Sequence, residues 1–340
     1  MPRAFVAARV PLVSTPAAVV VFLVSLVAIL AAASVFARRL DVLGAHLGLP
    51  EALLGLLTAA GADAPELSSA VVALAAGSKN VGLGVVVGSN LFNIASMIGI
   101  SAVVAGRLRL HREALALEGG VAGAATLIVA LLVLRVVPAW LALVLLLLVL
   151  LPYVAVISIA EGFPRVRLTR DQRAAVRHAV GPGHLPRPGG PSVRGSLLAI
   201  PPAVTVIVLG AIGMVHAAID LGHRWHVPQV VVGTIVLAIL TSIPNAYTGI
   251  RLGLSGRAAA LVSETMNSNT INLVGGLAIP ALFVSVARPT ALVGVDFACL
   301  GAATVLALVV LGSRDGAGRR SGLVLLGLYA GFIVLQGAAG

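Results

Sequence analysis

The feature that most limits how this chain can fold is a series of ten long apolar stretches. A helix needs about 20 apolar residues to cross the roughly 30 Å of hydrocarbon in a bilayer. Only 10% of the 340 residues are charged and the mean hydropathy is +1.09, whereas a soluble domain has roughly 25% charged residues. The sequence therefore predicts an all-α membrane protein with about ten transmembrane helices. The predicted spans lie near residues 12–36, 50–77, 81–105, 114–136, 138–160, 196–219, 228–252, 257–285, 289–312 and 320–338.

The distribution of basic residues predicts the orientation of these spans. Of the 23 Lys and Arg residues, 17 fall on the side of the long connection at 161–195, and 6 fall on the opposite side. Basic loops are retained in the cytoplasm. We therefore expect a multi-pass protein of the cell membrane with a cytoplasmic connection and both termini extracytoplasmic. The same bias accounts for the net charge of +11 without a nucleic-acid partner.

The long connection divides the chain into two predicted halves. Residues 1–160 form the first transmembrane half, and residues 196–340 form the second. The connection at 161–195 is rich in Arg, Gly and Pro and has no sustained apolar periodicity, which is typical of a solvated linker. The single cysteine, Cys299, excludes a disulfide framework.

The two halves carry an internal repeat. When the chain is shifted by 179 residues, polar positions near 50–105 coincide with polar positions near 228–285. Polar residues are costly inside apolar spans, so their coincidence at one offset indicates a true repeat. Five spans separate the copies, and an odd number inverts the second copy, as in transporters whose broken helices meet near the bilayer midplane. The coinciding pairs are Pro65 and Pro244, Gly77 and Gly256, Ser89 and Ser268, Asn90 and Asn269, and Asn93 and Asn272.

Each copy has a proline in the middle of a span. Pro65 and Pro244 each remove a backbone donor, which predicts a kink or a break in the helix. Polar side chains gather at both places, and Asp63 and Glu66 are three residues apart, so they share one helix face. The matching polar residues around the second proline are Thr241, Ser242 and Asn245. All of these groups offer oxygen, the ligand atom that hard cations such as Na⁺ and Ca²⁺ prefer.

At these residues the chain resembles the calcium/cation antiporter superfamily, which includes the sodium/calcium exchangers. The first copy, GADAPELSSAVVALAAGSKNVGLGVVVGSNLFNIASMIG, is similar to the first alpha repeat of that family, where P-E-L is followed by G-S-N-x-F-N. The second copy, TSIPNAYTGIRLGLSGRAAALVSETMNSNTINLVGG, resembles the second alpha repeat more loosely. The resemblance implies ten helices in an inverted five-plus-five repeat, and exchange of cations by alternating access.

The resemblance also implies a set of cation ligands. The family's ligand positions match Asp63, Glu66, Ser89, Asn93, Thr241, Ser242, Asn245, Ser268 and Asn272, with Asp63 and Glu66 as the metal-binding carboxylates. Three positions depart from the usual pattern: Ala62 lacks a hydroxyl, Asp63 has a carboxylate in place of a hydroxyl, and Asn245 stands where a second glutamate is usual. Either one charge has moved across the site and divalent binding is retained, or the asymmetric site prefers monovalent ions. Two close carboxylates also share a proton readily, because like charges disfavour full ionisation.

These features lead to three functional hypotheses. The first is Ca²⁺/Na⁺ exchange across the plasma membrane, and the second is exchange of Na⁺ or Ca²⁺ for H⁺. The third is a relative that kept the fold as a sensor or scaffold without transport, since the glutamate expected at Asn245 is absent. In each case the partners are lipid and inorganic cations, with no cofactor beyond the ions and no oligomeric state indicated.

Other acidic residues inside predicted spans have separate interpretations. Glu264 lies one turn before Ser268 and is an accessory candidate for ion binding. Glu118 is expected near the cytoplasmic end of its span, and Asp296 is expected to have a buried polar partner or an interfacial position. The GADAP segment superficially resembles the acidic motif of membrane aspartyl proteases, but those need a second paired aspartate, and the only candidate, Asp296, lacks a motif. We therefore expect a transporter and not an enzyme.

Overall fold

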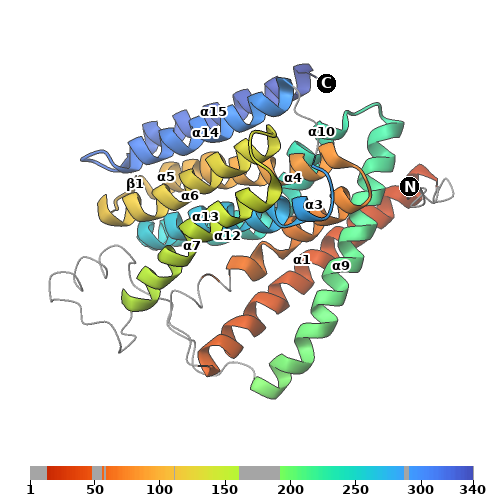
Figure 1. Ribbon diagram of the computed structural model, residues 1–340, viewed down its shortest axis with the longest axis horizontal. Coiled ribbons are helices and arrows are strands. Elements are labelled where there is room, and N and C mark those ends of the chain that lie inside the picture. The colour runs from red at the N-terminus through yellow and green to blue at the C-terminus, as the bar shows by residue number, and fades with distance from the viewer. Residues whose placement is uncertain are drawn as a thin grey trace.

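The structure is a computed structural model that describes residues 14–47, 56, 59–110, 112–160, 192–286 and 291–339. These residues form a bundle of helices joined by short turns (Figure 1). The predicted linker at 161–195 lies outside the described residues, except for 192–195. Residues 50–55, 57 and 58 of the span predicted at 50–77 also lie outside them.

In the first half, the described helices overlap the predicted spans, although the helix Thr15–His46 extends ten residues past the span predicted at 12–36. The break predicted between the fourth and fifth spans is present, since α6 ends at Val133 and α7 begins at Ala139, and Arg135 between them has a φ of 61°. The elements of this half are α1 (Thr15–His46), α3 (Ala64–Ala75), α4 (Lys79–Leu91), the π-helix η1 (Phe92–Met97), α5 (Ile98–Ala105), α6 (Arg112–Val133) and α7 (Ala139–Ala160).

The second half repeats this order. Its elements are α9 (Val193–Arg224), α10 (Gln229–Val231), the π-helix η2 (Val232–Leu237), α11 (Ala238–Thr241), α12 (Ile243–Leu254), α13 (Ala258–Leu273), the π-helix η3 (Val274–Ala278), the 3₁₀-helix η4 (Pro280–Leu282), α14 (Ala291–Leu311) and α15 (Arg319–Ala339). Gly77 and Gly256, which coincide in the repeat, both have positive φ, at 82° and 69°, in the turns that follow α3 and α12.

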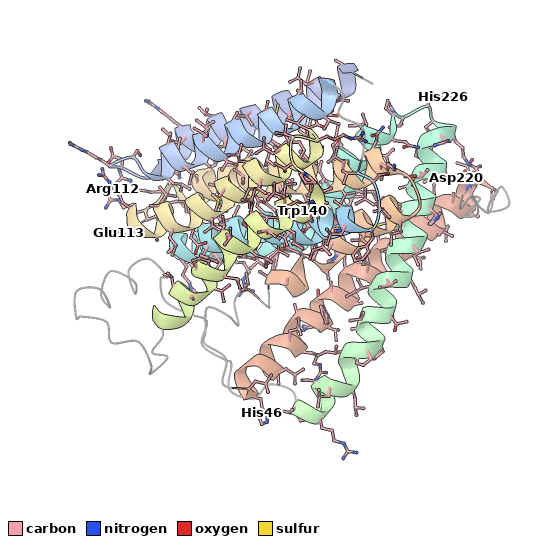
Figure 2. All side chains as sticks on the ribbon, in the orientation of Figure 1. His46, Arg112, Glu113, Trp140, Asp220 and His226 are labelled. Carbon is pink, nitrogen blue, oxygen red and sulfur yellow. The ribbon has the colours of Figure 1, made fainter. Side chains whose placement is uncertain are left out.

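The helices are arranged around a buried centre. Helices α1 and α9 lie side by side and form one flank, and α14 and α15 cover another (Figure 1). A short antiparallel pair, β1 (Arg107–Leu108) and β2 (Ala317–Gly318), joins the turns before α6 and α15 at one end of the bundle. Figure 2 shows Arg112 and Glu113 at this end, and Asp220 and His226 at the other, as expected where a membrane protein meets water.

Seven helices of the described chain are long and apolar enough to cross a membrane, or eight if one bent pair is a single span. The bent pair is Gln229–Thr241 with Ile243–Leu254, which meet at an angle of 51°. Inner and outer helices differ in burial. In the apolar 18-residue window of Lys79–Ala105, 94% is buried, whereas in the window of Ala139–Val156 only 17% is buried. The protein is thus an all-α, multi-pass membrane protein whose outer helices present apolar side chains to lipid.

The breaks predicted from the two prolines are present. Asp63 lies in a turn between the helical residues 59–62 and α3, and Ser242 lies between α11 and α12. Each proline occupies one of the first two positions of the helix after the break, where its missing N–H would have no intrahelical partner in any case. The two breaks therefore expose helix N-termini in the interior of the bundle, where the predicted site residues lie.

Candidate cation-binding site

The two helix breaks bring polar side chains of the first half against those of the second. Asp63 and Glu66 are each 1% exposed, and Asn245 is 3% exposed. Glu66 lies in the first turn of α3, where the helix N-terminus favours negative charge. The partners of both carboxylates come from α12, α13 and the turn between α11 and α12, so the site is built across the repeat.

Asp63 is held by two donors from the second half. Asn245 Nδ2 donates to Asp63 Oδ1 at 2.7 Å, and Ser268 Oγ donates to the same oxygen at 2.7 Å. Asn93 Nδ2 in turn donates to Ser268 Oγ at 2.9 Å, which joins the first half again. Three predicted ligands from three different helices are thus oriented around one carboxylate.

Glu66 has a matching set of donors. Ser242 Oγ donates to Glu66 Oε1, and Asn272 Nδ2 donates to Glu66 Oε2 at 3.2 Å. Asn245 Nδ2 lies 3.5 Å from Glu66 Oε1, so its amide is between the two carboxylates. The amide that stands in place of a second glutamate therefore donates toward the acids of the other half.

The contacts follow the repeat symmetry. A shift of 179 residues places Asp63 on Ser242 and Glu66 on Asn245. The same shift therefore exchanges the Asp63–Asn245 contact with the Glu66–Ser242 contact. The two hydrogen bonds are therefore equivalent under the repeat. In each of them the acid comes from the first half of the chain.

Two further predicted residues are buried here but have different surroundings. Thr241 Oγ1 donates to the backbone oxygen of Leu237 at 2.8 Å, in the preceding turn of its own chain segment. Ser89 is 0% exposed and its hydroxyl has no hydrogen-bond partner among the described residues. Glu264, the accessory candidate, also has a buried carboxylate oxygen without such a partner.

Several oxygens in this region are buried and have no hydrogen-bond partner within the described ranges. They are Asp63 Oδ2, Ser89 Oγ, Asn93 Oδ1, Asn272 Oδ1 and Glu264 Oε2. Buried polar atoms are normally satisfied, and carboxylate, amide and hydroxyl oxygens are the donor set that Na⁺ and Ca²⁺ take. The donor chemistry therefore fits a hard cation as a transported substrate.

The charge of the site comes from its acids. Among the described residues, Asp63 and Glu66 have no Lys or Arg partner, and the two ion pairs found there, Arg107–Asp315 and Arg224–Asp220, lie elsewhere. No group of three or more His, Cys, Asp or Glu side chains in this part of the chain is arranged to hold a metal. Any ion bound here would rely on two carboxylates and on neutral oxygens.

Two sets of buried polar residues were not predicted as functional. Asn90 Nδ2 donates to the backbone oxygen of Asn269 at 3.2 Å, which joins α4 to α13 directly. The 179-residue offset already marked this pair, so the signal was present in the sequence. The second set surrounds Glu118, which is buried in the second turn of α6, and no sequence signal connected it to its partners.

Asp296 has the buried polar partner that was one of its two interpretations. Gln336 Nε2 donates to Asp296 Oδ1, and the two residues are 0% and 1% exposed respectively. This contact joins α14 to α15 and lies on helices that contribute no side chain to the candidate cation site.

Comparisons with known proteins identify a matching family and similar folds. The family described as sodium/calcium exchanger protein matches residues 17–159 and 196–338. A structure of the sodium-calcium exchanger NCX_Mj is similar, with a TM-score of 0.61 and 20% identity over 94% of this chain and 98% of that chain. The H⁺/Ca²⁺ exchanger CAX gives a TM-score of 0.70 at 16% identity, over 94% of this chain and 86% of that one. Native YfkE gives 0.60 at 17% identity, over 95% and 96%.

At these identities, the structural likeness establishes the fold alone. No curated protein matches the chain.

Proposed function

The chain belongs to the sodium/calcium exchanger protein family, which comprises exchangers and not enzymes, and from this we propose that it is a secondary active antiporter exchanging Ca²⁺ for Na⁺. Transport occurs by alternating access around the site formed by Asp63, Glu66 and their partners from the second half. Neither a cofactor nor a covalent step is needed for this reaction.

One observation carries the proposal. Two buried carboxylates, Asp63 and Glu66, both lie within 3.5 Å of the Asn245 amide nitrogen and have no basic partner within the described residues. An uncompensated charge of about −2 is unfavourable in a low-dielectric interior. A divalent cation neutralises it with one ion, and two monovalent cations neutralise it equally, so the same site can accept either kind of ion in turn.

The proposed ligands extend beyond these two acids. Ser89, Asn93, Ser242, Ser268 and Asn272 supply neutral oxygens, and Thr241 contributes after release of its bond to Leu237. Glu264 lies one turn before Ser268 on α13 and acts as an accessory acid. This set supports Ca²⁺, which accepts six to eight oxygen ligands in a flexible geometry.

We also propose ten spans, with the linker in the cytoplasm and both termini outside. The second span consists of residues 59–62 and α3, and the eighth consists of α13 and η3. Each of these pieces alone is shorter than a full span. α1 and α9 form a separate flank (Figure 1) and are the elements that move relative to the other helices.

The alternative counter-ion is H⁺. It is favoured by the position of the Asn245 amide nitrogen, which lies 2.7 Å from Asp63 Oδ1 and 3.5 Å from Glu66 Oε1. Two like charges are thus kept in one small site, where binding of a proton relieves their repulsion. In that case, loading of Ca²⁺ displaces the proton.

Flux measurements on purified protein in liposomes test both forms of the proposal. Ca²⁺ uptake is measured under three conditions: with an outward Na⁺ gradient, with an outward H⁺ gradient, and with no gradient. We expect uptake driven by the Na⁺ gradient, with no uptake in protein-free liposomes. Uptake driven by H⁺ alone would select the alternative, and no Ca²⁺ movement under either gradient would contradict antiport and support the non-transporting hypothesis.

A further inference from the structure

A second polar cluster, in which Glu118 and Tyr153 are buried and Ser263 and Asn267 are half-buried, lies outside the cation site. Glu118 of α6, Tyr153 of α7, and Ser263 and Asn267 of α13 form a closed ring of contacts. Glu118 is 4% exposed and Tyr153 is 4% exposed. Among the described residues, none of these four side chains forms a hydrogen bond with a proposed cation ligand.

The ring consists of four contacts of hydrogen-bond length. Tyr153 Oη lies 3.0 Å from Glu118 Oε2 and 2.8 Å from Asn267 Oδ1. Asn267 Nδ2 lies 3.2 Å from Ser263 Oγ, and Ser263 Oγ lies 2.9 Å from Glu118 Oε1. Each side chain therefore takes part in two of the contacts.

Counting protons shows what the ring requires. A phenol and a hydroxyl have one O–H each, and the amide enters the ring through its oxygen on one side and one N–H on the other. An ionised Glu118 adds none, so three protons would serve four contacts. One pair of electronegative atoms would then meet in a buried site without a hydrogen between them, which is unfavourable. Exchanging the oxygen and nitrogen of the Asn267 amide leaves the count unchanged.

We propose that Glu118 is a proton-binding site in the interior of the membrane, separate from the cation site, and that its proton closes this ring. Glu118 Oε2–H donates to Tyr153 Oη, whose own O–H donates to Asn267 Oδ1. Asn267 Nδ2–H donates to Ser263 Oγ, whose O–H returns to Glu118 Oε1. Four protons then serve four contacts, and α6, α7 and α13 are joined in one direction around the ring.

The other charged and titratable groups nearby leave Glu118 without a counter-charge. On α6 itself, Arg112 and Glu113 are exposed at the first turn. From α13, Glu264 follows Ser263 in sequence, and from α14, Asp296 is bound to Gln336. The packed elements η3 and α7 contribute no charged side chain among their described residues, and Tyr153 is already part of the ring.

Release of this proton affects the helix that carries cation ligands. Ser263 and Asn267 are on α13, as are Ser268 and Asn272 at the cation site. When Glu118 is ionised, one contact of the ring becomes repulsive, and α13 is held less firmly against α6 and α7. The proton therefore stabilises one position of α13.

Thermal unfolding of purified protein across a pH series tests the proposal. The folded chain holds a proton that the unfolded chain releases at neutral pH, so unfolding releases a proton and stability falls as pH rises. Glu118→Gln supplies an amide N–H in place of the acid O–H and keeps four protons. We expect this variant to unfold within a degree or two of the wild type at low pH and to show a smaller high-pH decrease, because the other acids inside the bundle, Asp63, Glu66, Glu264 and Asp296, remain. Glu113→Gln, at an exposed acid of the same helix, is the matched control and should retain the decrease.

Infrared spectroscopy gives a second readout that does not depend on the stability of one variant. The difference between wild type and Glu118→Gln should contain the C=O band of a protonated carboxyl group at neutral pH. Tyr153→Phe removes one partner of that group and should shift the same band. A carboxylate band in place of the acid band, or a Glu118→Gln variant that follows the wild-type pH profile, would overturn the proposal. Neither readout involves ion flux, so this result is independent of the proposed exchange.

Discussion

At the scale of single residues, the two acids of the candidate site have different surroundings. Asp63 is a turn residue bound by Asn245 and Ser268, whereas Glu66 is within the first turn of α3 and is bound by Ser242 and Asn272. The sequence predicted that these residues share a site, because their spacing around two prolines repeats. It did not predict that Asn245 donates toward both acids, since that depends on which way an amide side chain faces.

Replacing Glu66 by glutamine should abolish exchange. The amide keeps the size of the side chain and one acceptor for Ser242, so the protein should still fold, but the site loses one of its two charges. Ca²⁺ flux in liposomes should fall to the level of protein-free liposomes, while Glu113→Gln, an exposed acid on α6, should leave flux unchanged. Normal exchange by folded Glu66→Gln would exclude Glu66 as a central ligand.

Replacing Asn245 by glutamate should strengthen divalent binding. The change adds a third carboxylate within reach of Asp63 and Glu66, and one charge at about 4 Å in a partly shielded interior contributes up to about 4 kcal/mol. We expect calorimetry to show Ca²⁺ affinity increased about tenfold or more. Asn245→Gln, which lengthens the side chain without charge, is the control, and equal affinity in the glutamate variant and the wild type would count against the site.

At the scale of elements, the broken helices and the close contact of α4 with η2 determine where the candidate cation site lies in the bundle. The breaks at Asp63 and Ser242 were predicted because proline cannot continue a hydrogen-bonded helix. The three π-helices were not predicted, since they depend on packing and leave no local sequence pattern. η1 and η3 overlap under the 179-residue shift. η1 contains Asn93 and follows the helix with Ser89, and η3 follows the helix with Ser268 and Asn272.

The contact between α4 and η2 should not tolerate a methyl group. A Cβ added at Gly88 would lie 2.3 Å from the backbone oxygen of Thr234. Gly88→Ala should therefore lower the stability by about 1–3 kcal/mol, as overpacking does, and reduce flux because Ser89 is displaced. Thermal unfolding and liposome flux measure the two effects. Gly120→Ala on α6, where nothing lies within 4 Å of the added Cβ, should change neither.

At the scale of the whole molecule, the inverted repeat was the part of the fold most accessible from sequence. Pro65 with Pro244 and Ser89 with Ser268 fixed the offset, and the helices of the two halves follow in the same order. The number of spans was less accessible, because α3 has 12 residues and α13 has 16. At 1.5 Å per residue, neither crosses about 30 Å alone, so helix length does not separate a broken span from a re-entrant segment.

The central claim is that one acidic charge has moved from the second half of the site to the first, with divalent binding retained. It is tested most directly by Ca²⁺ flux in Asp63→Ser and in the double variant Asp63→Ser with Asn245→Glu. The single variant should lose Ca²⁺ flux, and the double variant, which has one carboxylate on each half, should regain it. Full flux in Asp63→Ser, or a folded double variant as inactive as the single one, would contradict the account.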